Sequence, residues 1–216
     1  MFVGHFAAGL AGKAIEPRAP LWSMIAASQF LDWGWSGLVL AGVEHFRIDP
    51  HLPGSALALY DMPWTHSLPG ALALSALGGA IARFVLGLRP RAAVVIGAVV
   101  VSHWALDLLV HRPDLLLWPG GPKVGLSLWN QPVPEEIVEI GLLAVVAPFW
   151  AFSRAAEGRR AWPAALFLAG LLGLQFVAAS GAETGTPQSL AATSLAIYLL
   201  VTLAAWWLDR GPARTA

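Results

Sequence analysis

Six long runs of apolar residues constrain this chain more than any other feature of its sequence. A helix that crosses the hydrocarbon core of a bilayer needs about 20 mostly apolar residues. Pro and Gly residues or clustered charges separate the runs, as is typical of loops. We therefore expect an all-α, polytopic membrane bundle with spans at residues 21–43, 64–86, 92–111, 134–152, 162–180 and 189–208.

The composition argues against a water-soluble protein. Only 12% of the 216 residues are charged, whereas about 25% are charged in an ordinary soluble domain. The hydrophobic share of 57% excludes a disordered chain. The 13 basic and 13 acidic residues balance, which disfavours a nucleic-acid partner. Because the chain has no Cys, disulfides, thiolate metal ligands and a Cys nucleophile are excluded.

A shorter apolar run covers residues 2–15. A helix there rises about 1.5 Å per residue and reaches only ~20 Å, which is too short to cross. Lys13 follows the run, whereas the positive charge of a signal peptide precedes it. We expect a retained N-terminal half-helix and one membrane domain over 1–216, in which 1–140 carry the site and 141–216 form accessory helices.

The basic residues are distributed unevenly between the two sides of the predicted bundle. Ten of the 13 lie on one side, and only Arg47, Arg112 and Lys123 lie on the other. Cytoplasmic loops are enriched in Lys and Arg. This bias predicts a cytoplasmic C-terminus and places the loops 44–63 and 112–133 outside.

Ionisable groups inside the spans are the candidates for function, because a charge at membrane depth is costly and usually faces a bundle interior. His103, Asp107 and His111 follow one another at intervals of four residues, so they share one face of a helix. A His and a carboxylate at this spacing can bind one metal ion, as paired His residues do in helical zinc sites. The alternative is a buried His that only hydrogen-bonds to Asp.

Two other spans carry polar residues at a similar depth. Gln29 and Asp32 lie three residues apart near the middle of the first span. His66 lies about one turn inside the second span, which Pro63 is expected to begin, and Asp61 lies just outside it. A lone carboxylate at the depth of Asp32 needs a cationic partner to stay charged.

His5 in the half-helix and Glu139 in the fourth span complete the set, whereas the last two spans carry nothing comparable. Because the polar groups share the middle or outer half of the membrane, we expect a single site. Imidazole with carboxylate suits Zn, Mn or Fe, and zinc is our first expectation, with a two-metal site as the alternative to a single ion. The expected metal ligands are His5, Asp32, His66, His103 and Asp107.

A metal ion can activate a water molecule for attack on an ester. Glu139 and Asp61 are then the candidate general bases, or they orient the His ligands. Candidate contacts to the substrate or to the ligands are His111, Ser67, Gln29, Arg112 and Lys123.

Three sequence runs resemble the YdjM-like family of inner-membrane metal-dependent hydrolases. They are Thr65-His66-Ser67-Leu68, Ser102-His103-Trp104-Ala105-Leu106-Asp107 and Leu115-Leu116-Leu117-Trp118-Pro119. The resemblance covers roughly the first 140 residues and implies a metal-dependent hydrolase of the bacterial inner membrane. The HxxxD element is also similar to that of zinc-dependent phospholipase C proteins, which implies a lipid or phosphodiester substrate.

The chain departs from the family pattern at two places. Family members often have Asp-x-Asp in the first full span, where this chain has Asp32-Trp33-Gly34. They often have His-Arg before Thr-His-Ser, where this chain has Asp61-Met62. The departures predict a changed ligand set, with Asp61 as the candidate substitute.

Three functions fit these observations. The leading one is a membrane-embedded hydrolase in which a metal-activated water attacks a lipid or lipid-linked (phospho)ester at the outer half of the bilayer. The second is a transporter or an ion or proton relay that uses the same polar groups. The third is a structural scaffold whose polar residues only tie helices together.

Overall fold

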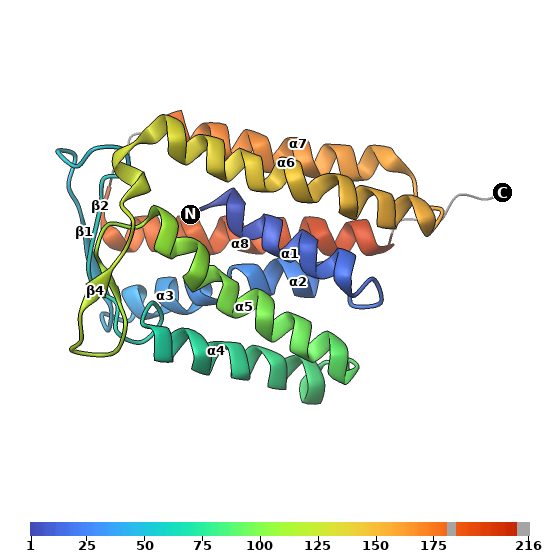
Figure 1. Ribbon diagram of the computed structural model, residues 1–216, viewed down its shortest axis with the longest axis horizontal. Coiled ribbons are helices and arrows are strands. Elements are labelled where there is room, and N and C mark those ends of the chain that lie inside the picture. Colours follow the sequence, from blue (N-terminus) through green and yellow to red (C-terminus); the bar gives the residue numbers. More distant parts are fainter. Residues whose placement is uncertain (181–184, 211–216) are drawn as a thin grey trace.

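The computed structural model describes residues 1–180 and 185–210. The helices run along one long axis, and short β-strands cover one end of the bundle (Figure 1). The C-terminal residues on which the predicted cytoplasmic end falls, and much of the loop before α8, lie outside the described residues.

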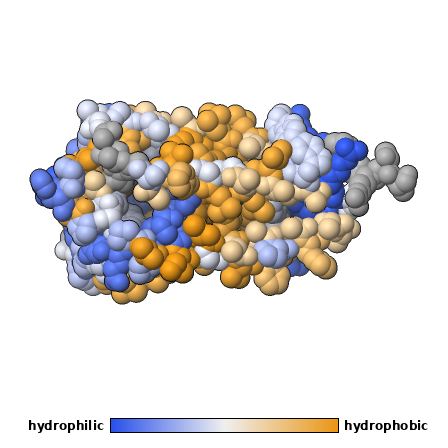
Figure 2. All heavy atoms as spheres, turned by 90° about the horizontal axis from the view of Figure 1, so that it is seen from above, coloured by the Kyte–Doolittle hydropathy of each residue, from blue (hydrophilic) through white to orange (hydrophobic). Residues whose placement is uncertain are grey.

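Within the described residues, five helical segments are long and apolar enough to cross a membrane. Their surface forms a hydrophobic band across the middle of the molecule, between hydrophilic ends (Figure 2). Phe84, Phe152 and Phe176 are 74–82% exposed, as is typical of side chains that face lipid. The five segments are α4 (Leu68–Ala80) with the π-helical turn η1 (Ile81–Val85), α5 (Pro90–Val110), α6 (Pro132–Ala156), α7 (Ala161–Ser180) and α8 (Pro187–Arg210).

The first expected span, residues 21–43, is not one continuous helix. It is divided at Gln29 into α2 (Leu21–Ser28) and α3 (Phe30–Leu40). Irregular backbone at membrane depth is tolerated only where protein or water covers it. Gln29 is 1% exposed, so the break is buried in the bundle. The expectation of six continuous spans is therefore corrected to five and a broken pair.

The short helix α1 (Val3–Ile15) lies inside the bundle against α2, α5 and α6. It approaches α2 closely at Gly9, where an added Cβ would lie 2.9 Å from the carbonyl oxygen of Met24. Most of its side chains are buried, so α1 belongs to the core of the bundle.

The two last helices complete the core. One buried apolar cluster combines Phe6 of α1 with Leu143 of α6, Phe167 of α7 and Val201 of α8. Helix α8 also contacts α2 and α3. The segment 141–216, expected to be accessory, therefore supplies part of the central packing.

The loops 44–63 and 112–133 contain β-strands that the sequence analysis missed. They form two antiparallel pairs, and Phe46 of the first pair is buried against Trp35. The remaining elements are β1 (His45–Ile48), β2 (Leu57–Asp61), β3 (Leu115–Leu116), β4 (Lys123–Val124) and the 3₁₀-helix η2 (Leu128–Asn130).

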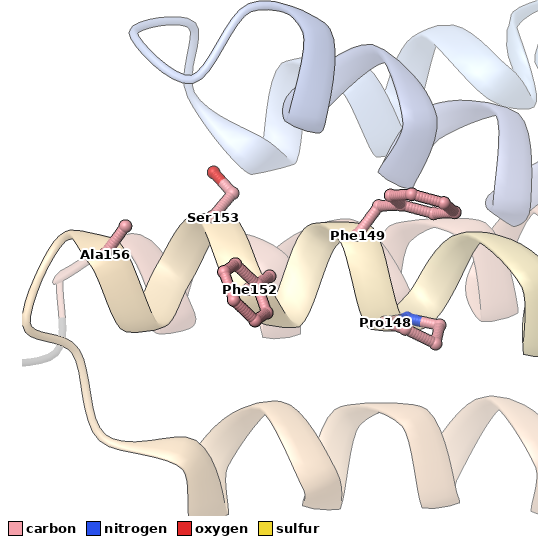
Figure 3. Close-up of a pocket in the computed structure, with 5 residues that line it drawn as sticks. All are labelled: Pro148, Phe149, Phe152, Ser153 and Ala156. Atoms are coloured by element: carbon pink, nitrogen blue, oxygen red, sulfur yellow. The ribbon is translucent and has the colours of Figure 1, made fainter.

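A hollow of about 430 Å³ lies along the second half of α6 (Figure 3). Its lining is apolar apart from one hydroxyl, so it offers no group for acid–base or metal chemistry. Glu139 lies in the first half of the same helix, about one to two turns from its start. The hollow is lined by Pro148, Phe149, Phe152, Ser153 and Ala156.

We predict that Gly9→Val lowers the thermal unfolding temperature of the detergent-purified protein. The new side chain overlaps the backbone of α2, and overpacking of this kind costs about 1–3 kcal/mol. Gly37→Val is the matched control, because a Cβ at Gly37 meets nothing within 4 Å. Equal unfolding temperatures for the two variants contradict the close approach of α1 and α2.

Candidate metal centre

Helix α5 supplies the centre of a buried polar cluster. It carries His103 and Asp107 on one face, and His111 directly follows its last residue. The Nε2 atom of His103 lies 3.2 Å from Asp107 Oδ2, and that of His111 lies 3.5 Å from Asp107 Oδ1. The three residues are at most 3% exposed. The four-residue spacing thus places both imidazoles against one carboxylate.

Two further ligands come from the starts of other helices. Asp32 lies in the first turn of α3, directly after the break at Gln29. His66 lies in a turn before α4, because Ser67 is the N-cap and the helix begins later than predicted. The His66 Nε2 atom lies 3.4 Å from Asp32 Oδ1 and 3.6 Å from Asp107 Oδ2.

His103 Nε2 also lies 3.5 Å from Asp32 Oδ1. Each of these two imidazole nitrogens therefore lies within 3.6 Å of both carboxylate oxygens. We call this group the four-atom cluster: Asp32 Oδ1, His66 Nε2, His103 Nε2 and Asp107 Oδ2.

A hydrogen bond on the other ring nitrogen orients each imidazole of the cluster. His103 Nδ1 lies 2.8 Å from the carbonyl oxygen of Ser28, which is available because α2 ends there. His66 Nδ1 lies 2.8 Å from the hydroxyl oxygen of Thr65, and this hydroxyl donates to Glu44 at 2.6 Å. Both Nδ1 atoms are therefore assigned as N–H donors, which leaves the lone pair of each neutral ring on Nε2.

The four-atom cluster thus consists of electron-pair acceptors that face one another. No described residue donates a hydrogen bond to His103 Nε2, which is buried. Such an arrangement is unfavourable in a low-dielectric interior unless a cation lies between the groups.

The spacing of the cluster fits a metal ion. Ligands about 2.0–2.1 Å from a tetrahedral zinc ion lie about 3.3 Å from one another. The four measured separations in the cluster range from 3.2 to 3.6 Å. His and Asp groups in the described part of the chain could therefore hold a divalent ion at this position.

The cluster is least covered at Asp32, whose side chain is 14% exposed, whereas those of His66, His103 and Asp107 are at most 4% exposed. The hydroxyl of Tyr198 on α8 donates to Asp32 Oδ2 at 2.9 Å. The sequence analysis missed Tyr198, because a single phenol in an apolar span carries no local signal and its partner lies 166 positions away.

Helix α1 brings His5 to the other oxygen of Asp107. His5 Nε2 lies 3.0 Å from Asp107 Oδ1, and its ring stacks on His103 with a centroid distance of 3.6 Å. Glu139 accepts hydrogen bonds from the backbone N–H groups of Phe2 and Gly4, both at 2.6 Å. Glu139 thus fixes the start of α1, and this geometry favours orientation of His5 over the predicted role as general base.

Other predicted site residues lie elsewhere in the structure. Asp61 on β2 is 2.8 Å from His45, and its side chain is 44% exposed. Arg112 donates to carbonyl oxygens of the segment 53–57, and Lys123 donates to a carbonyl oxygen of β2. In the structure Asp61 thus pairs the two strands of its own loop, and Arg112 and Lys123 tie the segment after α5 to the loop that contains β1 and β2.

Ser67 and Gln29 also have local partners. The Ser67 hydroxyl donates to the carbonyl oxygen of Pro63 and accepts from the backbone N–H of Gly70. The Gln29 amide lies at the buried helix break, 3.4 Å from the carbonyl oxygen of Phe2. Both residues therefore shape the backbone that presents the ligands.

Comparison with known proteins finds no matching family model, curated protein or solved structure. What the centre can bind is therefore inferred from the chemistry and geometry of the His and Asp side chains themselves.

We predict that Thr65→Val weakens zinc binding by roughly 10–100-fold, the usual cost of losing an outer partner of a metal-bound His. The substitution removes the oxygen that orients His66 but keeps the side-chain shape. Competition titration with a chromogenic chelator measures the affinity. Thr193→Val is the control, because its exposed hydroxyl bonds only within α8. Unchanged affinity in Thr65→Val contradicts the assigned orientation of His66.

Proposed function

We propose that this chain is a membrane-embedded metal-dependent hydrolase that cleaves a lipid or lipid-linked (phospho)ester. The four-atom cluster is the observation that carries the proposal, since its spacing and burial suit one divalent ion. The resemblance to the YdjM-like hydrolases supports the same activity and a location in the bacterial inner membrane. Zinc is the proposed ion, and Mn or Fe are the alternatives.

In this proposal Asp32, His66, His103 and Asp107 hold the ion. A bound ion of this kind lowers the pKa of a water molecule to about 7 and polarises an ester oxygen. Tyr198 donates to Asp32 Oδ2, which leaves Oδ1 for the ion. Hydrolysis adds the water oxygen to the phosphorus or carbonyl carbon, breaks the ester bond and moves the water proton to the leaving alcohol.

The surroundings of the cluster favour a lipid substrate. Apolar helices enclose it, and the β-strand end of the bundle carries the loops predicted to lie outside. Asp32, the most exposed ligand, lies where α3 meets α8. An ester at the level of the lipid headgroups can approach there while its acyl chains remain in the membrane.

We predict that the zinc-loaded protein hydrolyses a fluorogenic phosphodiester or phospholipid in mixed micelles, and that chelation abolishes the activity. His66→Gln should lower kcat by at least about 100-fold, because a bound metal supplies several kcal/mol of transition-state stabilisation. His45→Gln is the control, since it removes an exposed imidazole that pairs with Asp61. Equal activity of the His66 variant and the wild type, or no metal in the wild type, overturns the proposal.

A cation or proton relay is the second candidate, and the helix break favours it. Paired half-helices that meet at a polar point form the substrate sites of many transporters. The Oε1 atom of Gln29 is buried at this break, and no described residue donates to it. Ion flux in proteoliposomes that Asp32→Asn abolishes, without hydrolysis by either protein, favours the relay.

A further inference from the structure

We infer that Asp107 bridges two cations. Its Oδ2 atom belongs to the four-atom cluster, whereas its Oδ1 atom, together with His5 and His111, forms a second cation site. The inference rests on the proposed function for the first ion and adds a second ion to it.

The second site consists of two imidazoles that both contact one carboxylate oxygen. His5 Nε2 lies 3.0 Å and His111 Nε2 lies 3.5 Å from Asp107 Oδ1. His5 and His111 are 1% and 3% exposed, so solvent does not satisfy these atoms. The two nitrogen–oxygen separations are close to those in the four-atom cluster, and His5, His103 and Asp107 also offer ligand atoms that lie within 4.8 Å of one another.

An outer carboxylate orients His111 as Thr65 orients His66. His111 Nδ1 lies 2.8 Å from Asp114 Oδ1, which follows α5 in the outer loop. The carboxylate accepts the Nδ1 proton, so the neutral ring directs its Nε2 lone pair at Asp107. The sequence analysis did not include Asp114, although its three-residue spacing from His111 was visible.

The charges around the centre suit two divalent ions better than one. Asp32 and Asp107 contact the imidazoles directly, Asp114 contacts His111, and Glu44 reaches His66 through Thr65. These four carboxylates together carry four negative charges, which two divalent ions would neutralise. One such ion together with the Met1 α-ammonium beside Asp107 leaves one of these four negative charges uncompensated, which is costly at this depth.

A positive group already lies at the second site in this structure. The α-ammonium of Met1 is 2.9 Å from Asp107 Oδ1. The position therefore accommodates positive charge, and a cation would take the place of this ammonium.

The second ion would narrow the class of substrate. Four protein groups complete a tetrahedral shell, so an ion at the four-atom cluster would take a water only by expanding to five-coordinate, whereas three groups leave a position for water or a substrate oxygen, as in catalytic zinc sites. Two adjacent ions can hold the attacking and leaving oxygens of an in-line displacement, the arrangement of phosphatases and nucleases. The geometry thus favours a phosphoester over a carboxylic ester.

Metal counting tests the inference without any substrate. The detergent-purified full chain is stripped with chelator, loaded with zinc, passed through gel filtration and analysed by mass spectrometry. The wild type should retain about two ions per chain, and His111→Gln and Asp114→Asn should each retain about one. Asp107→Asn should retain none, and the exposed-loop control His51→Gln should match the wild type. Anomalous scattering from wild-type crystals should give two peaks on opposite sides of Asp107.

Each other result has a distinct meaning. One ion in the wild type, unchanged in His111→Gln and Asp114→Asn, overturns the second site and leaves the proposed function standing. Two ions in the wild type that remain in both of these folded variants place the second ion elsewhere and also overturn the inference. No ion in the wild type overturns the proposed function itself. Thermal unfolding of each variant verifies folding, and Asp114→Asn keeps the test valid if His111→Gln fails to fold.

Discussion

One buried carboxylate, that of Asp107, is the interaction on which the rest of this structure depends. Imidazole nitrogens from α1, α5 and the turn before α4 converge on its two oxygens. Desolvation of such a charge costs several kcal/mol unless partners compensate for it. The surrounding segments are arranged as they are because each brings an imidazole, a carboxylate or an outer acceptor to this point in an otherwise apolar bundle.

Most of the polar side chains around Asp107 are held in place by backbone that departs from regular helix. The break at Gln29 ends α2 early, and the freed Ser28 carbonyl orients His103. The first turn of α1 is held by Glu139, which places His5 beside Asp107. A continuous helix would satisfy its own backbone groups and leave no acceptor for an imidazole. These departures from regular helix orient the His and Asp side chains that could hold a metal ion.

The sequence was sufficient for the features that depend on local pattern. Hydropathy located five helices, and four-residue spacing placed His103 and Asp107 on one face. The sequence was not sufficient for features that depend on contacts between residues far apart in the chain. Tyr198 meets Asp32 across 166 positions of sequence, and the helix break is buried by neighbouring segments. Asp61 is close to His66 in sequence, but strand pairing places it beside His45.

X-ray absorption at the zinc edge of the loaded protein tests the central claim most directly. The account predicts a first shell of only nitrogen and oxygen at about 2.0–2.1 Å, with the outer-shell signal of imidazole. That imidazole signal should weaken in folded His103→Gln. A protein that retains no zinc after gel filtration, or a spectrum that His103→Gln leaves unchanged, would contradict a metal centre at Asp107.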